Sequence, residues 1–186
     1  IGIDIGQTAD PTTIAMTELQ WRLRDEHNPT LRAYTDHHLV RWLEAMPLKT
    51  PYPKVVERLG VLISTVRERV KYGNLVSRAG WLEPEDEAEV EVYVDATGVG
   101  APLVDMLEQN GLNVIGVYFT GEDMRREVID EQTNRRVVRL GKTIMVSRLQ
   151  SLLQTRRLHL PNTPEAKIVA RQLLDFEIRT SQAGRT

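Results

Sequence analysis

The sequence contains no cysteine among its 186 residues. That absence excludes disulfide bonds, thiolate metal sites and a thiol nucleophile, and it is typical of proteins that work in a reducing cytoplasm. Aromatic side chains make up only 5% of the residues, and Trp21, Trp42 and Trp81 are too scattered to form a base-stacking platform. No apolar run approaches the ~18 residues of a membrane span, and no secretory signal is present. We therefore expect a cytoplasmic location and no membrane partner.

Neither sign of charge dominates the sequence. Lys and Arg number 24, Asp and Glu number 26, and the formal net charge is -2. No global basic field therefore indicates nucleic acid binding, although basic side chains can still gather on one face. With 41% hydrophobic residues, a chain of this length suits one well-packed α/β domain.

Both ends of the sequence lie close to strand-like segments. Ile1 begins within a strand pattern without a leading Met, and the closing TSQAGRT follows a strand-like segment without a final helix. We interpret residues 1–186 as a single domain that belongs to a longer chain.

Apolar periodicity and turn residues predict three strands and then alternating helices and strands in the first part of the chain. A polar, Arg-rich loop or hairpin tip is expected over 20–34, and an acidic loop over 83–89. The expected elements are, in order, strands 1–7, 13–19 and 36–45, helix 54–72, strand 91–97, helix 101–110 and strand 112–119.

The second part of the chain adds two helices. Residues 120–141 hold five acidic residues and five arginines, which predicts a hairpin or a mobile loop. A helix is expected over 142–156, another from Pro164 to about residue 174, and a last strand at 176–180. The whole order favours an α/β fold in which a mixed sheet, led by three antiparallel strands, carries helices on both faces.

Two of these strands carry a carboxylate where an apolar residue would suit the core. Asp4 lies within IGIDIG, and Asp95 ends the run EVYVD. A buried carboxylate without a partner is unfavourable, so such groups are usually paired, protonated or bound to metal. If the two strands are neighbours, both acids meet at one edge of the sheet.

A divalent cation would remove the repulsion between two such acids. Mg²⁺ prefers oxygen ligands and typically takes one or two carboxylates together with phosphate and water. A pair of such ions can hold a phosphodiester and activate a water for in-line attack. We therefore predict that Asp4 and Asp95 bind metal. In the alternative interpretation, each Asp ends a strand or caps a turn and faces water.

A second functional interpretation uses the same residues. GIDIGQT is similar to the first phosphate loop of actin-like and Hsp70-like ATPases, and VDATGVG is similar to a second. Those ATPases need two such domains, for which this chain is too short, so an ATPase fragment is kept as the alternative.

Longer segments resemble the nuclease domain of phage large terminase subunits. IGIDIGQTADPTTIAM is similar to that family's first acidic motif, and VYVDATGVGAPLVDML to its second. LVRWLEAMPLKTPYPKVVERL resembles its third strand and the Pro-Tyr-Pro entry to its first helix. LGKTIMVSRLQSLLQTRRLHLP resembles its Lys-led helix and the strand-like exit that follows, and LLDFEIRTSQAGRT resembles the strand before its last motif. The resemblance covers nearly the whole chain in the right order.

This resemblance implies an RNase H-like fold and a metal-dependent DNA endonuclease that cuts duplex DNA during phage or prophage genome packaging. It implies Asp4 and Asp95 as catalytic acids and metal ligands, Mg²⁺ or Mn²⁺ in a two-metal site, and action in the bacterial host cytoplasm. Double-stranded DNA is the expected partner, with the small terminase subunit and the portal protein as partners of the full-length chain.

The sequence departs from the family pattern in two ways. The family's third acid lies in a His-Asp-Asp-type motif after the last strand, and no such motif occurs before Thr186; Asp175, at a helix end, is a poor substitute. The family's preceding ATPase motor and its GxxxxGK[ST] loop are also absent. A packaging module that binds DNA without cutting it therefore remains a further alternative.

Basic residues after residue 120 are candidates for phosphate contact. Lys142 opens a predicted helix, where the helix dipole opposes its charge, and it either meets a DNA phosphate or is solvated. The same two interpretations apply to the arginines between the predicted strand and helix, where the intervening acids favour a solvated loop. These arginines are Arg125, Arg126, Arg135, Arg136 and Arg139. Asp10, in ADPT, is expected to form a turn rather than to bind metal.

Overall fold

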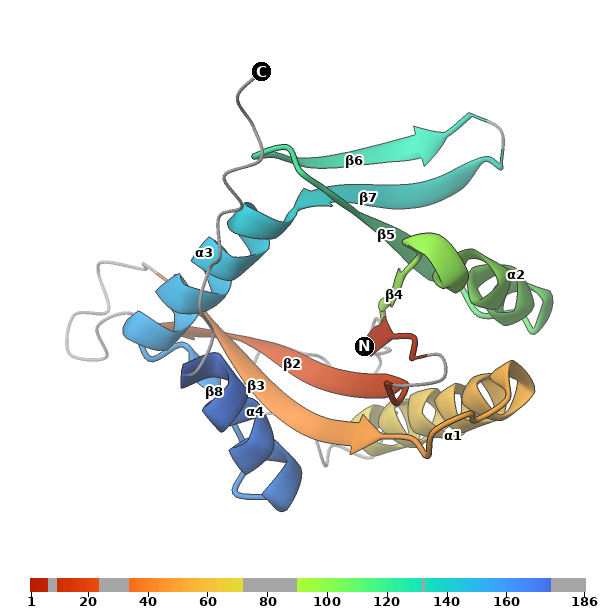
Figure 1. The fold of residues 1–186 in the computed structure, drawn as a ribbon. Helices are drawn as coiled ribbons and strands as arrows, with labels where there is room; N and C mark the ends of the chain where they lie inside the picture. Colours follow the sequence, from red (N-terminus) through yellow and green to blue (C-terminus); the bar gives the residue numbers. More distant parts are fainter. Residues whose placement is uncertain (7–9, 24–33, 72–89, 132, 175–186) are drawn as a thin grey trace.

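The computed structural model describes residues 1–6, 10–23, 34–71, 90–131 and 133–174. Within these residues the chain forms an α/β fold built on one eight-stranded mixed sheet (Figure 1). The strands are β1 (Gly2–Asp4), β2 (Thr13–Leu23), β3 (Tyr34–Ala45), β4 (Val92–Asp95), β5 (Val114–Thr120), β6 (Arg125–Asp130), β7 (Arg135–Gly141) and β8 (Leu158–His159).

The sheet order is β6-β7-β5-β4-β1-β2-β3-β8. The pairs β1–β2 and β2–β3 are antiparallel, which confirms the prediction of three leading antiparallel strands. β4 pairs in parallel with β1, β5 with β4, and β7 with β5. The carboxyl ends of β1, β4, β5 and β7 therefore all lie at one end of the sheet.

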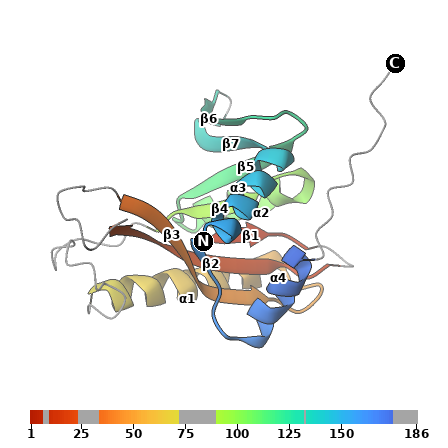
Figure 2. The same cartoon turned by 90° about the vertical axis from the view of Figure 1, so that its left-hand side faces the viewer.

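Four α-helices connect and flank these strands in the described part of the chain. They are α1 (Tyr52–Lys71), α2 (Ala101–Gln109), α3 (Lys142–Gln154) and α4 (Pro164–Leu174), and a 3-10 turn, η1 (Gly98–Gly100), precedes α2. Figures 1 and 2 place α1 and α2 on one side of the sheet and α3 and α4 on the other, as expected from the sequence. None of these helices combines the length and the apolar composition that crossing a bilayer requires.

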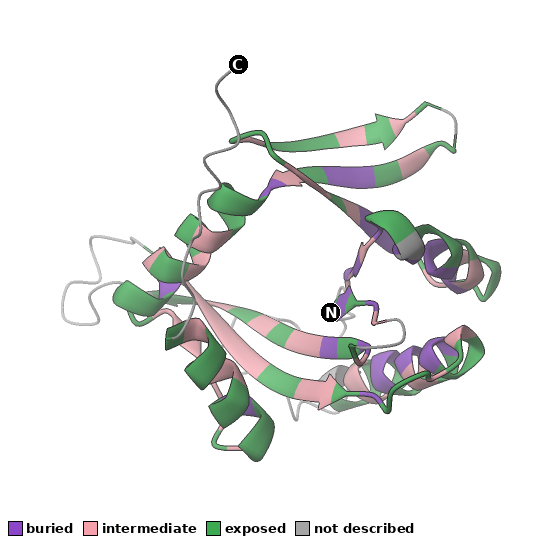
Figure 3. Ribbon diagram, in the orientation of Figure 1, coloured by how far each residue is buried: buried purple, intermediate pink, exposed green. Residues whose placement is uncertain are grey.

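The main core lies between the sheet and the α1–α2 layer. Leu59 of α1 and Leu107 of α2 are completely buried, and they belong to the same cluster as Ile3, Ile14 and Val94 of the central strands. α3 and α4 each bury a single residue, Leu152 and Ala166. Figure 3 shows this asymmetry, because buried positions follow α1 and α2 while α3 and α4 are mostly exposed. The other face of the sheet is therefore more open.

Local sequence explains where several elements begin and end. The Ala166 backbone N–H donates to Thr163 Oγ1 at 3.2 Å, so Thr163 caps α4 as its Thr-Pro-Glu start predicts. α2 ends before Gly111, which has a φ of +76° that glycine adopts without strain. The charged segment 120–141 folds as the β6–β7 hairpin, one of the two predicted outcomes.

One prediction is wrong at both of its ends. The loop or hairpin tip expected over 20–34 begins four residues too early and ends at a strand residue, because β2 continues to Leu23 and β3 begins at Tyr34. Cross-strand polar contacts such as the bond that Thr35 Oγ1 donates to the Arg22 carbonyl oxygen, at 3.4 Å, support a polar strand pair that the apolar pattern alone does not reveal. Residues 24–33, the acidic segment 83–89 and the predicted strand 176–180 lie outside the described residues.

Candidate metal centre

Asp4 ends β1 on the face of the sheet opposite to the main core. Along this strand Ile3 is buried, whereas Gly2 and Asp4 are exposed. Successive side chains of a strand point to opposite faces. Because Ile3 packs in the cluster with α1 and α2, Asp4 lies on the face that carries α3 and α4.

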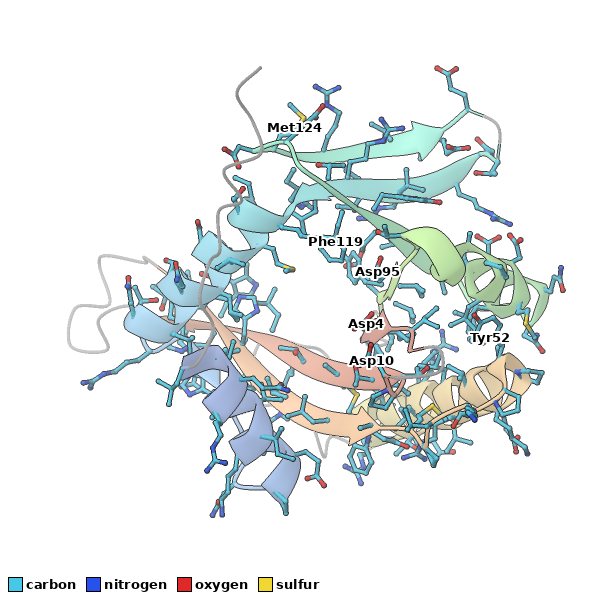
Figure 4. The ribbon with its side chains drawn as sticks, in the orientation of Figure 1. Asp4, Asp10, Tyr52, Asp95, Phe119 and Met124 are labelled. Carbon is cyan, nitrogen blue, oxygen red and sulfur yellow. The ribbon has the colours of Figure 1, made fainter. Side chains whose placement is uncertain are left out.

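Asp95 ends β4 in the same orientation. Val94 is completely buried, and Asp95, the next residue, is only partly buried. β1 and β4 are parallel, and Ile3 is the partner of Val94. The next position on each strand is an aspartate, so Asp4 and Asp95 lie side by side on strands about 5 Å apart. Figure 4 shows both side chains at this end of the two strands. The structure thus brings together the two acids that the sequence singles out.

The acid pair is electrostatically unfavourable without a cation. Partial desolvation is the largest cause that raises the pKa of Asp4 above its ordinary value, and the negative charges of Asp95 and Asp10 raise it further. A hydrogen bond from the Ile5 backbone opposes this shift. The end of β1 therefore disfavours a charged carboxylate unless positive charge is supplied there.

Asp10 is a third acid beside Asp4. The sequence pattern predicted only a turn for it. Its carboxylate acts on the Asp4 carboxyl, and Figure 4 shows it next to Asp4. The antiparallel pairing of β1 and β2 explains why Asp10 lies near Asp4. Asp4 pairs with Thr13, so the residues just before Thr13 must return to the end of β1.

Two glycines allow the backbone to fold closely around the acids. A Cβ on Gly6 would lie 2.0 Å from the carbonyl oxygen of Asp10, and a Cβ on Gly100 would lie 1.8 Å from that of Asp95. Neither distance is possible for a real side chain. Gly6 and Gly100 are therefore required by close backbone approach.

Threonine hydroxyls fix the same two loops. The Gly6 N–H donates to Oγ1 of the buried Thr12 at 3.3 Å. The Phe119 N–H donates to Thr97 Oγ1 at 3.1 Å, which ties the end of β4 to β5. The Thr97 N–H in turn donates to Asp95 Oδ1 at 2.8 Å. Asp95 therefore caps a turn, as the alternative interpretation expected, but a carboxylate has about four acceptor positions and keeps others for a cation.

The donor set fits a hard divalent cation. Among the residues that the structure describes, no group of three or more His, Cys, Asp or Glu side chains is arranged to hold a metal. Asp4 and Asp95 are the two carboxylates that would hold such an ion, and water and substrate phosphate would complete the shell, as Mg²⁺ commonly allows. Asp175, a poor third acid on sequence grounds, lies outside the described residues.

Lys142 begins α3 directly after β7, at the same end of the sheet as Asp4 and Asp95. Its side chain is exposed. Its contact with a phosphate stays a prediction, now supported by its place at this edge.

Arg135 and Arg136 are already engaged by carboxylates. Arg135 pairs with Asp105 at 2.6 Å and with Glu108 at 2.7 Å, both on α2. Arg136 pairs with Glu91 at 2.8 Å and also with Glu127. The DNA contacts predicted for these two arginines remain untested, but each would have to share a charge that now holds the β6–β7 hairpin in place. Arg139 is exposed.

Comparison with protein-family models, with curated proteins and with solved structures finds no match for this chain. The functional assignment therefore depends on the residues and their geometry.

Proposed function

We propose that this chain is the nuclease domain of a phage or prophage terminase large subunit, with an RNase H-like fold, and that it cuts duplex DNA during genome packaging. The observation that carries the proposal is the pairing of Asp4 and Asp95 on adjacent parallel strands, on the open face of the sheet. The leading order of three antiparallel strands followed by parallel β4 and β5 agrees with the fold that the resemblance implies.

The proposed chemistry follows from the charges at this edge. Mg²⁺ or Mn²⁺ bound there would supply charge stabilisation and an activated water for in-line displacement at phosphorus. Asp4 and Asp95 would hold such an ion, and the hydrogen bond from the Thr97 N–H fixes the orientation of Asp95. Lys142, at the same sheet end, supports the proposal because its ammonium group can meet a DNA phosphate. A bacterial host cytoplasm, the small terminase subunit and the portal protein belong to the same proposal as location and partners of the full-length protein.

Metal-dependent cleavage of duplex DNA by the full-length protein tests the proposal. Asp4→Asn and Asp95→Asn should each lower the rate at least ~100-fold, because even the supporting partners of metal ligands typically contribute 10–100-fold. Glu57→Gln is the matched control, since Glu57 is an exposed acid on α1 that pairs with Lys54, and it should cut at the wild-type rate.

Three other outcomes would contradict the proposal. Cleavage that persists in both Asn variants would assign the acids to turn capping. Tight ATP binding in a thermal-shift assay, without any effect of DNA, would favour the phosphate-loop ATPase. Binding of DNA without cleavage under any divalent metal would favour a non-catalytic packaging module.

A further inference from the structure

The β6–β7 hairpin carries five arginines that fall into two groups. Three are neutralised by carboxylates within the described residues. The three are Arg125 with Glu127, Arg135 with Asp105 and Glu108, and Arg136 with Glu91 and Glu127. The other two, Arg126 and Arg139, form no ion pair with any described residue, and both are exposed.

Arg126 and Arg139 are direct cross-strand partners in the antiparallel β6–β7 ladder. Side chains in this relation lie about 5 Å apart at Cβ, and like charges placed so are destabilising. Among the residues that the structure describes, the two hairpin arginines without an ion pair thus lie next to each other, and the remaining three are paired with carboxylates. An anion bound between the two guanidinium groups would remove this repulsion.

Tyr118 extends this pair into a row across three strands. It is the partner of Arg139 in the parallel β5–β7 ladder, and its side chain is 39% exposed. A Cβ on Gly116 would contact Ala96 Cβ at 3.4 Å and Tyr118 Cε2 at 3.5 Å. These contacts place Tyr118 on the Val94–Ala96 side of the sheet, which is opposite to Asp95.

We propose that Arg126 and Arg139 together bind a phosphodiester group of nucleic acid, and that this contact is separate from the Asp4–Asp95 centre and lies on the other face of the sheet. The oxygens of one phosphate can accept hydrogen bonds from both guanidinium groups, because arginine binds phosphate through paired hydrogen bonds. The neighbouring Tyr118 offers an aromatic face on which a base can stack. The choice of nucleic acid over an acidic protein rests on the proposed function, in which DNA is the substrate.

The pair would hold DNA away from the point of cleavage. β6 is the edge strand of the sheet, so a strand of DNA at this edge meets the row of Tyr118, Arg139 and Arg126 without passing over the acids. The metal centre and this contact can therefore be disabled independently.

The test measures the affinity of the full-length protein for a fluorescent duplex in EDTA, which prevents metal-dependent cleavage, over a series of NaCl concentrations. The double variant Arg126→Gln, Arg139→Gln should bind roughly tenfold more weakly or worse. Its plot of log affinity against log salt should be shallower by about 1, since one phosphate contact is lost. Lys54→Gln, which also removes positive charge but from an exposed residue of α1 that is already paired with Glu57, should keep the wild-type slope.

Thermal melting separates this effect from misfolding. The double variant should melt at the wild-type temperature or above it, because it loses the repulsion between the two arginines. If the wild type and the double variant bind DNA with the same affinity and the same salt slope, the proposal is overturned. An acidic protein surface is then the better candidate partner for Arg126 and Arg139, and the proposed nuclease function still stands. If the wild type binds no duplex at all, the proposed function fails as well.

Discussion

Asp4 and Asp95 occupy the positions that follow the Ile3–Val94 pair on two parallel strands, so both carboxylates leave the same face of the sheet at the same end. Ile3 and Val94 supply the buried side of this arrangement, and the two acids supply its open side. Each strand end thus has an apolar side chain packed in the core on one face and a carboxylate on the other face.

The first prediction concerns the stability of the metal-free protein. A carboxyl whose pKa is raised on folding contributes stability below its unfolded pKa and loses it as the pH rises through the folded value. The pKa of Asp4 is raised above 3.8 by desolvation and by Asp95 and Asp10. Asp4→Asn should therefore increase the free energy of unfolding at neutral pH without metal, and this gain should disappear at a pH below about 4.

Urea unfolding at the two pH values, in EDTA, measures that difference. A loss of stability in Asp4→Asn at neutral pH would indicate that the Asp4 carboxylate makes favourable contacts and would contradict the electrostatic account.

The second prediction concerns Gly100. An added methyl group would meet the Asp95 carbonyl oxygen at 1.8 Å, so Gly100→Ala must displace the backbone that carries Asp95. We expect a loss of about 1–3 kcal/mol in stability and weaker metal binding. Gly60→Ala is the matched control, because Gly60 lies within α1 and a Cβ added there would meet no atom within 4 Å, and it should gain about 0.5–1 kcal/mol. Equal effects of the two substitutions on the free energy of unfolding in urea would show that Gly100 is not sterically required.

The third prediction concerns a histidine pair at the β3–β8 edge. His37 Nδ1 and His159 Nε2 lie 2.9 Å apart, and the two rings stack with centroids 5.2 Å apart. Burial lowers the pKa of both, and the positive charge of Arg22 lowers both further. Arg157 also lowers the pKa of His37, whereas Asp36 raises it.

A histidine whose pKa is lowered on folding takes up its proton more readily in the unfolded chain. Stability should therefore fall as the pH decreases below about 6.5, the ordinary value for histidine. Chemical unfolding of the wild type and of His159→Gln between about pH 7.5 and 5.5 measures this effect. The variant should show a smaller decrease, and an equal decrease in both proteins would refute the role of the pair.

The fourth prediction concerns the unequal packing of the two faces. Leu107 of α2 is completely buried, and Leu153 of α3 is 38% exposed. Leu107→Ala should cost about 2–5 kcal/mol through loss of contacts and a cavity, whereas Leu153→Ala should cost less than about 1 kcal/mol. Denaturant melts of the two variants provide the comparison, and similar losses would contradict the assignment of the main core to the α1–α2 face.

Much of the fold could be predicted because local patterns determine it. The helices α1 and α2 have regular apolar spacing, and Thr163 marks the start of α4 with its hydroxyl. The polar continuation of β2 was missed, since it is supported by cross-strand contacts such as Thr35 Oγ1 with the Arg22 carbonyl oxygen, 13 residues apart. No local pattern contains such a partner.

The candidate site shows the same limit. Asp4 and Asp95 could be singled out because each interrupts an apolar strand, but Asp10 lies in a turn, where an aspartate is ordinary. The pairing of Arg136 with Glu91 joins residues 45 apart, so sequence could not distinguish the neutralised arginines of the hairpin from Arg126 and Arg139. The ion pairs of the folded hairpin supplied that distinction.

The central claim is that Asp4 and Asp95 together hold a divalent cation, and calorimetric titration with Mn²⁺ tests it most directly. The wild type and the Glu57→Gln control should bind Mn²⁺ alike, whereas Asp4→Asn and Asp95→Asn should each bind at least ~100-fold more weakly. Wild-type Mn²⁺ affinity in both Asn variants would contradict the account.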